Sequence, residues 1–95
     1  MIFLEYIDQI NKFRVWQRCH PLTSSQISLW YALIGLSNDL GGEKEISVAI
    51  STLEIETGLK KTAICQARNK LSQVGLIKWK KQNKNQSSVY ELVFV

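Results

Sequence analysis

The sequence predicts an α+β domain that is mostly helical, and three observations lead to this fold class. Apolar residues recur at steps of three and four through much of the first 74 positions, which is the spacing of amphipathic helices. After Gly75 apolar and polar residues alternate, which is the spacing of β-strands. The 95 residues suffice for one hydrophobic core, and no linker or repeat divides them. We therefore expect a single domain over residues 1–95.

Two helices are expected in an N-terminal part that spans about residues 2–40. The first carries one apolar stripe and ends before Pro21, because the residue before a proline avoids helical geometry. Thr23 and Gln26 fit a capping box that starts the second helix. The second helix has two apolar stripes and no charge before Asp39, so it must be covered on two sides. One cover is the core, and the other is either the first helix or a second subunit.

A short strand over residues 45–48 and a helix-turn-helix over about residues 51–75 follow. The short first helix of this unit opens at a second capping box, Ser51-x-x-Glu54, and Gly58 suits its end because glycine tolerates positive φ. The apolar residues of the short helix are Leu53 and Ile55. The long second helix, from about residue 61 to 74, has an apolar stripe made of Ile64, Ala67, Leu71 and Val74.

The C-terminal part, about residues 76–95, predicts a β-hairpin. Ile77 and Trp79 alternate with Lys78 and Lys80, and a second alternating run follows a polar loop. The order of helix, helix, strand, short helix, long helix and hairpin is that of a winged helix-turn-helix with an extra N-terminal helix, in which the hairpin is the wing. We predict this architecture for the chain.

The net charge of +4 conceals an uneven distribution along the chain. Residues 1–56 contain seven acidic and four basic side chains, whereas residues 57–90 contain eight basic and no acidic ones. A segment of one sign attracts polyanions, and this segment coincides with the predicted long helix and hairpin. The alternative is an ordinary solvated surface, in which the strand lysines serve to prevent edge-to-edge pairing.

The long helix carries uncharged polar residues opposite its apolar stripe. Asn and Gln can pair with both edge groups of an adenine, and Thr can contact a thymine methyl group. We predict that four of them face DNA bases: Thr62, Gln66, Asn69 and Gln73. Basic residues of the helix and hairpin are predicted to face phosphates: Lys60, Lys61, Arg68, Lys70, Lys78, Lys80, Lys81 and Lys84. For Arg68, pairing with an acidic residue of the N-terminal half is an alternative.

No motif indicates catalysis, a metal or a cofactor. The sequence lacks a phosphate-binding loop, a nucleophile elbow and an H-E-x-x-H pair. His20, Cys19 and Cys65 are too few for a zinc site or a disulfide framework, and they favour reduced thiols in the cytoplasm. No export signal or membrane-spanning stretch is visible. We expect a cytoplasmic protein that is not an enzyme, binds no cofactor or metal and does not enter a membrane.

Several segments resemble the N-terminal winged-helix domain of DnaD-like phage and prophage replication proteins. They are Tyr6–Phe13, Pro21–Ser24, Leu29–Leu33, Ile46–Leu53, Thr57–Leu59, Ala67–Leu71 and Gly75–Ile77. The resemblance covers nearly the whole chain. It implies a DNA-binding module of a replication initiator or primosome component, with double-stranded DNA and a helicase or helicase loader as partners. In such proteins a second domain follows. Lys60 departs from the pattern, because such turns often have Ser there.

The same resemblance implies a rival role, in which the domain serves self-association and makes little DNA contact. The residues predicted for self-association are Phe3, Tyr6, Leu29, Leu33 and Leu36. The two roles are compatible in a homodimer that presents two wings. A transcriptional repressor of the same fold is a further alternative.

Overall fold

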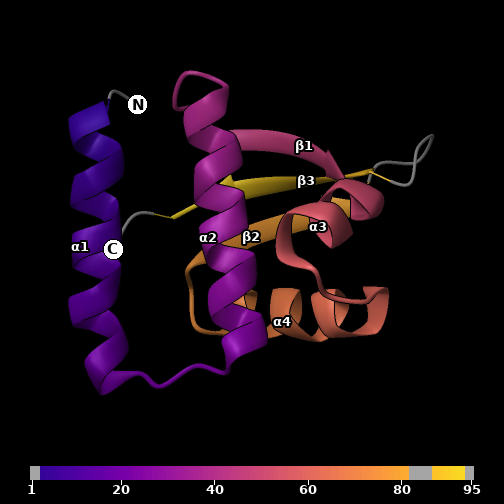
Figure 1. Cartoon of the computed structure of the whole chain (residues 1–95), viewed down its shortest axis with the longest axis horizontal. Coiled ribbons are helices and arrows are strands. Elements are labelled where there is room, and N and C mark those ends of the chain that lie inside the picture. The colour runs from indigo at the N-terminus through magenta and orange to yellow at the C-terminus, as the bar shows by residue number, and fades with distance from the viewer. Residues whose placement is uncertain (1–2, 82–86, 94–95) are drawn as a thin grey trace.

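Four helices and three strands make up the part of the chain that the computed structural model describes, residues 3–81 and 87–93, with side chains from Tyr6 onward. The elements are α1 (Phe3–Cys19), α2 (Ser24–Asp39), β1 (Glu45–Ala49), α3 (Ile50–Thr57), α4 (Lys61–Gln73), β2 (Ile77–Lys81) and β3 (Ser87–Leu92). The predicted α+β class, with helices predominating, is confirmed. The helices lie on one side of the sheet and along its lower edge in Figure 1.

The strands form an antiparallel sheet in the order β1-β3-β2. Trp79 on β2 lies opposite Tyr90 on β3, which lies opposite Ile46 on β1. The pairing of β2 with β3 confirms the predicted hairpin, and β1 extends one residue beyond the predicted strand. Because side chains alternate along a strand, these three residues share one face of the sheet. Ile46 and Tyr90 are buried, so this inner face contributes to the core.

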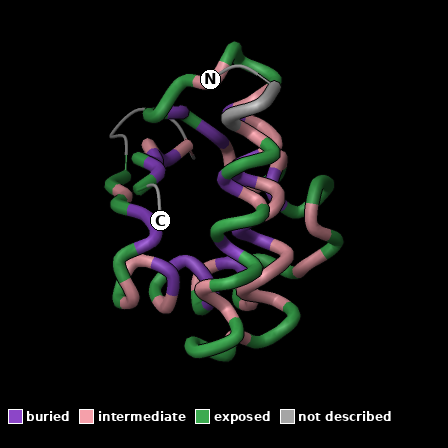
Figure 2. The backbone as a smooth tube through the Cα atoms, turned by 90° about the vertical axis from the view of Figure 1, so that its left-hand side faces the viewer, coloured by how far each residue is buried: buried purple, intermediate pink, exposed green. Residues whose placement is uncertain are grey.

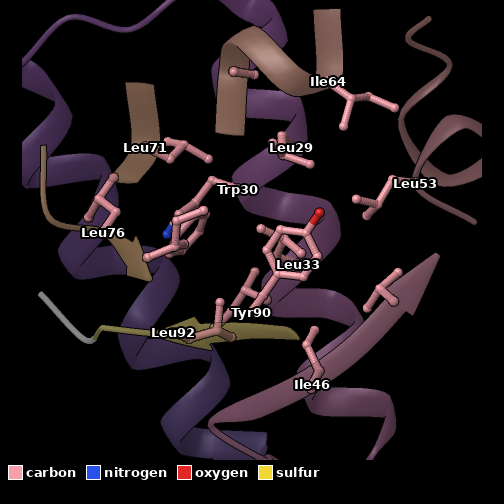
Figure 3. Packing of buried hydrophobic residues seen from close by; sticks show 14 of the residues in the cluster. Leu29, Trp30, Leu33, Ile46, Leu53, Ile64, Leu71, Leu76, Tyr90 and Leu92 are labelled. Atoms are coloured by element: carbon pink, nitrogen blue, oxygen red, sulfur yellow. The ribbon is translucent and has the colours of Figure 1, made fainter. Parts of the chain in front are cut away.

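The hydrophobic core lies between the inner face of the sheet and helices α2 and α4 (Figure 3). Leu33 from α2 and Leu71 from α4 are fully buried with Tyr90. Burial of such side chains stabilises the fold by roughly 1.5–3 kcal/mol each relative to full exposure. The buried residues gather on the sides of the elements that face the centre of the molecule (Figure 2).

Helix α1 covers the apolar stripe of α2 that contains Trp30 and Tyr31. Phe13 is fully buried, and its ring stacks on Trp30 of α2 with centroids 3.9 Å apart and planes 7° apart. The same ring meets Tyr31 edge-on, with centroids 5.7 Å apart. Such aromatic pairs add to the free energy gained from burial. Of the two covers that the sequence left open for α2, the structure therefore has the first helix of the same chain.

This packing contradicts part of the set of residues predicted for self-association. Leu29 and Leu33 are fully buried in the core, so neither is accessible to a second subunit, and their prediction is wrong. Tyr6 and Leu36 are partly buried against the same core. The side chain of Phe3 lies outside the described residues. A helix with two apolar stripes has the same sequence pattern whether its second stripe packs against the same chain or against a second subunit. Only the tertiary structure distinguishes these two cases.

The N-terminal cap agrees with the prediction for α2 and differs from it for α3. The capping box of α2 is confirmed. The backbone N–H of Gln26 donates to Thr23 Oγ1 over 3.3 Å, and the backbone N–H of Thr23 donates to Gln26 Oε1 over 3.0 Å. The capping box predicted at Ser51 is wrong, because β1 runs directly into α3 and the N-cap is Ala49, which has no side-chain cap. The short helix ends as predicted at Gly58, whose φ is +72°.

Candidate nucleic-acid interface

The turn between α3 and α4 is held by a threonine at the end of α3. The hydroxyl of Thr57 donates to the Leu53 carbonyl over 2.6 Å and accepts from the Leu59 amide over 3.1 Å. The Gly58 amide donates to the Glu54 carbonyl over 2.9 Å, which completes the end of α3. The connection over residues 58–60 is therefore fixed by hydrogen bonds, and it sets the direction in which α4 leaves α3.

The α4 helix separates an apolar side from a polar side. Ile64 and Leu71 are fully buried, and Ala67 is 1% exposed. The four residues predicted to face bases lie at steps of four, three and four along the helix, and all are exposed: Thr62, Gln66, Asn69 and Gln73. We call these four side chains the α4 polar face. Its members lie together on one exposed side of the helix because residues three and four apart share a side.

Lysines stand at both ends of the α4 polar face. Lys60 and Lys61 are exposed at the N-terminus of α4, and Lys70 is partly exposed in its last turn. The N-cap residue, Lys60, makes no side-chain cap hydrogen bond, and the first turn of α4 contains no acidic residue. The positive end of the helix dipole and two ammonium groups therefore lie together, an arrangement that favours an anion nearby.

Two lysines of the hairpin, Lys78 and Lys80, lie on a different surface from the α4 polar face. Trp79 points toward α4, so its neighbours Lys78 and Lys80 point to the opposite, outer face of the sheet, where both are exposed. Lys81 is exposed at the end of β2, which is an edge strand. By the same alternation Lys81 lies on the side of β2 that carries Trp79, so only Lys78 and Lys80 are separated from the α4 polar face by the sheet. Lys84 lies outside the described residues.

Acidic residues share the outer face of the sheet with Lys78 and Lys80. Glu91 on β3 lies directly opposite Lys78 on β2 and opposite Glu45 on β1. A shallow groove on this face is lined by Glu45, Lys78, Trp79, Lys80, Val89 and Glu91. In the sequence Glu91 directly follows the basic segment, and only the strand register places it opposite Lys78. Lys78 is therefore less suited to a phosphate than Lys80 or Lys81, because carboxylates offset its field.

Arg68 is not a surface residue, and its predicted role in facing phosphate is wrong. Its side chain is 5% exposed, and the guanidinium lies 3.6 Å from the centre of the Trp79 ring. Nη1 donates to the Tyr90 hydroxyl over 3.4 Å, and Nη2 approaches Cys65 Sγ at 3.5 Å. Nε has no hydrogen-bond partner among the described residues. The alternative, pairing with an acidic residue of the N-terminal half, is not seen among these contacts either.

The geometry of the Arg68 cluster assigns it a structural role. The Arg68 guanidinium stacks on the ring of Trp79 in β2 and donates to the hydroxyl of Tyr90 in β3. It therefore links α4 to both strands of the hairpin. A cation over an indole ring is attracted by the ring quadrupole, and burial strengthens that attraction. The Arg68 side chain thus fixes how α4 sits against the hairpin. The reduced thiol of Cys65 is partly buried beside it.

The remaining sequence candidates form no metal-binding group in the described ranges. His20 stacks on Trp16, and its Nδ1 lies 2.9 Å from the Trp16 carbonyl, as fits a residue at a helix end. Within residues 3–81 and 87–93 no three His, Cys, Asp or Glu side chains could hold a metal ion together. The same ranges contain no helix that is long and apolar enough to cross a membrane. Comparisons with protein-family models, curated proteins and solved structures find no match to this chain.

Proposed function

We propose that this chain is a DNA-binding domain of the winged helix-turn-helix type. In this proposal α3 and α4, joined at residues 58–60, are the helix-turn-helix, and the β2–β3 hairpin is the wing. The element order and the β1-β3-β2 sheet support the architecture. One observation carries the function: the exposed side of α4 is polar, uncharged and flanked by lysines, and residues 57–73 contain no acid.

The α4 polar face suits direct readout of bases. A B-DNA major groove is about 12 Å wide and admits one α-helix. Gln66 and Asn69 lie in the middle of the exposed face, where amide side chains can pair with N6 and N7 of an adenine. Thr62 lies near the N-terminus of α4, the end that enters deepest in helix-turn-helix docking. Gln73 lies at the other end of the helix and supplies a further amide.

Phosphate contacts would surround this face. Lys60 and Lys61 at the N-terminus of α4 meet one strand, where the helix dipole adds to their attraction. Lys70 meets the backbone near the other end of the helix. Lys80 and Lys81 reach the neighbouring backbone around the β2 edge. These contacts position the helix in the groove and carry no sequence information of their own.

A salt titration tests the proposal. The anisotropy of a labelled duplex is followed as protein is added at several salt concentrations. Six phosphate contacts correspond to a slope of log K against log salt of about −5. Lys12→Ala removes a lysine outside the proposed interface and serves as the control. Lys12 lies on α1 and is paired with Asp8 at 3.0 Å, so its loss should leave the slope unchanged. Absence of binding at low salt, or a flat salt dependence, would refute the proposal. An unlabelled single strand as competitor tests the preference for duplex.

We infer a replication role from the resemblance to DnaD-like proteins, with a helicase or helicase loader as protein partner. The alternative is a transcriptional repressor of the same fold. The two roles differ in the DNA that the domain should prefer. Capture of fragments from the genome that encodes the chain separates them, since an initiator enriches an origin beside replication genes. Enrichment of a divergent promoter instead would favour the repressor.

A further inference from the structure

The N-terminal half of the chain contains a second segment without acidic residues. Asp8 is the last acid before it and Asp39 is the first one after it, so residues 9–38 carry only positive charge. The cations of this segment are Lys12, Arg14 and Arg18. Lys12 is paired with Asp8 at 3.0 Å, whereas neither arginine has an ion pair among the residues that the structure describes. The negative net charge of residues 1–56 therefore conceals a local positive region.

Arg14 and Arg18 form one exposed patch on α1. They lie four residues apart, on neighbouring turns of the same side of the helix, and they line a shallow hollow with Gln17. Lys12 lies on another side, because two residues correspond to a rotation of about 200° around a helix. We call Arg14 and Arg18 the α1 arginine pair. Like charges at this spacing repel each other, and an anion bound between them relieves the repulsion.

The α1 arginine pair lies toward the side of the molecule where α4 lies. In Figure 1 the C-terminal end of α1, the α1–α2 connection and the N-terminal end of α2 are all at the bottom, as is α4. Helix α2 packs on α4, and its first turn contains no acidic residue. The C-terminal end of α4, which carries Lys70, is the end nearer α1. A surface built from acid-free segments therefore connects the α4 polar face to the α1 arginine pair.

Several acids of the N-terminal half lie at the opposite side. Asp39 is the last residue of α2, whose C-terminal end is at the top in Figure 1. Glu43 lies in the connection that follows, and Glu45 begins β1. The count of charges along the sequence gave this half a net negative charge, but the fold separates its arginines from these acids. The positive potential below the molecule thus extends beyond α4 to α1.

We propose that the α1 arginine pair is a second phosphate-binding surface, which contacts the DNA strand beyond the C-terminal end of α4. This inference rests on the proposed function, because it takes the duplex to be bound at the α4 polar face. Helices packed side by side lie about 8–10 Å apart, which is comparable with the major-groove width of about 12 Å. The backbone that borders the groove holding α4 therefore comes within reach of α1. A guanidinium group suits this contact, because its planar donors can bind a phosphate in bidentate fashion.

The contact makes α1 part of the DNA-binding surface as well as a cover for α2. Phosphate contacts carry no sequence information, so the arginine pair strengthens binding without changing which bases are preferred. It lies on the same side of the duplex as Lys70, which the proposed function places near the C-terminal end of α4.

Salt titrations of a labelled duplex of about three helical turns test this inference. Arg14→Gln with Arg18→Gln should reduce the slope of log K against log salt by about 1.8 and lower the affinity by about tenfold at 0.1 M salt. Arg14→Lys with Arg18→Lys should keep the wild-type slope, because it keeps both charges. Lys12→Ala is the control on the same helix and should also keep the wild-type slope, because Lys12 is paired with Asp8. All of these side chains are exposed, so urea denaturation should give the variants the wild-type midpoint.

The outcomes separate this inference from the proposed function. If the wild-type protein binds with the expected salt slope and the glutamine variant has the same slope, the inference is overturned and the proposed function stands. If the wild-type protein shows no salt-dependent binding, both are overturned. An equal fall in slope for Lys12→Ala would also overturn the inference, because it would show an effect of net charge. So would an equal fall for the lysine variant, because the arginines would then act through something other than their charge.

Discussion

Helices α3 and α4 share one core but present opposite chemistry to solvent. Leu53 of α3 and Ile64 of α4 are both fully buried, so the two helices are anchored in the same way. Outward, α3 presents Ile55 between two glutamates, whereas α4 presents its polar face between lysines. A phosphate backbone is attracted to the second surface and repelled by the first. In the proposed function a polyanion would therefore approach from α4, and the exposed side of α3 would face away from it.

The largest effect separates the two sides of α3. Leu53→Ala should lower the free energy of unfolding by about 2–5 kcal/mol, because Leu53 is 0% exposed and its loss leaves a cavity. Ile55→Ala should change it by no more than about 0.5 kcal/mol, since Ile55 is 83% exposed. Urea denaturation of both variants measures the two values. Equal losses would mean that Ile55 is also part of the packed monomer and that the contrast with α4 is mistaken.

The next effect concerns the cationic end of α4. Lys60→Ala with Lys61→Ala should lower DNA affinity by about ten- to a hundredfold at 0.1 M salt and reduce the salt slope by about 1.8. Both lysines are exposed, so the double variant should unfold at the same urea concentration as the wild type. Anisotropy titrations at several salt concentrations measure the slope. An unchanged slope would show that phosphate does not approach this end of α4.

A smaller effect tests whether Arg68 acts through packing. Arg68→Lys should lower the free energy of unfolding by about 1–2 kcal/mol, because an ammonium cannot reproduce a planar group stacked on Trp79. Arg68→Met should cost no more than about 1 kcal/mol, because the described residues offer the buried cation no carboxylate. Urea denaturation compares them. A fall in salt slope for Arg68→Met, with stability retained, would instead return Arg68 to the phosphate contacts.

The elements that the sequence predicted well are those set by local patterns. Helices α1, α2 and α4 follow the steps of three and four, and their ends follow from Pro21, from the Thr23 capping box and from Gly75 with φ of +85°. The hairpin follows from the change to alternation after Gly75. Each signal lies within a few residues of the feature that it specifies, so tertiary contacts are not needed to interpret it.

The features that the sequence missed depend on distant partners. Arg68 lies on the buried side of α4, although its charge favoured the prediction of a surface position. The residues that contact its guanidinium, Trp79 and Tyr90, belong to the hairpin. Ile55 is one of the apolar residues of the short helix, yet none of the described elements covers it. Glu91 lies opposite Lys78 only because of the strand register. A helical or strand period assigns a side to each residue, but it does not reveal what lies against that side.

The smallest effect asks whether the acids of α3 act on DNA at all. Glu54→Gln with Glu56→Gln should raise DNA affinity by about two- to threefold at 0.05 M salt, because two like charges near the phosphates are removed. The gain should vanish at about 0.5 M salt, where the Debye length is only a few ångströms. Glu43→Gln is the control, since Glu43 is exposed in the α2–β1 connection, far from α4 in Figure 1. Anisotropy at both salt concentrations measures the change. A loss of affinity in the α3 variant would mean that DNA rests on α3 as well, and the contrast between the two helices would then lie in their packing alone.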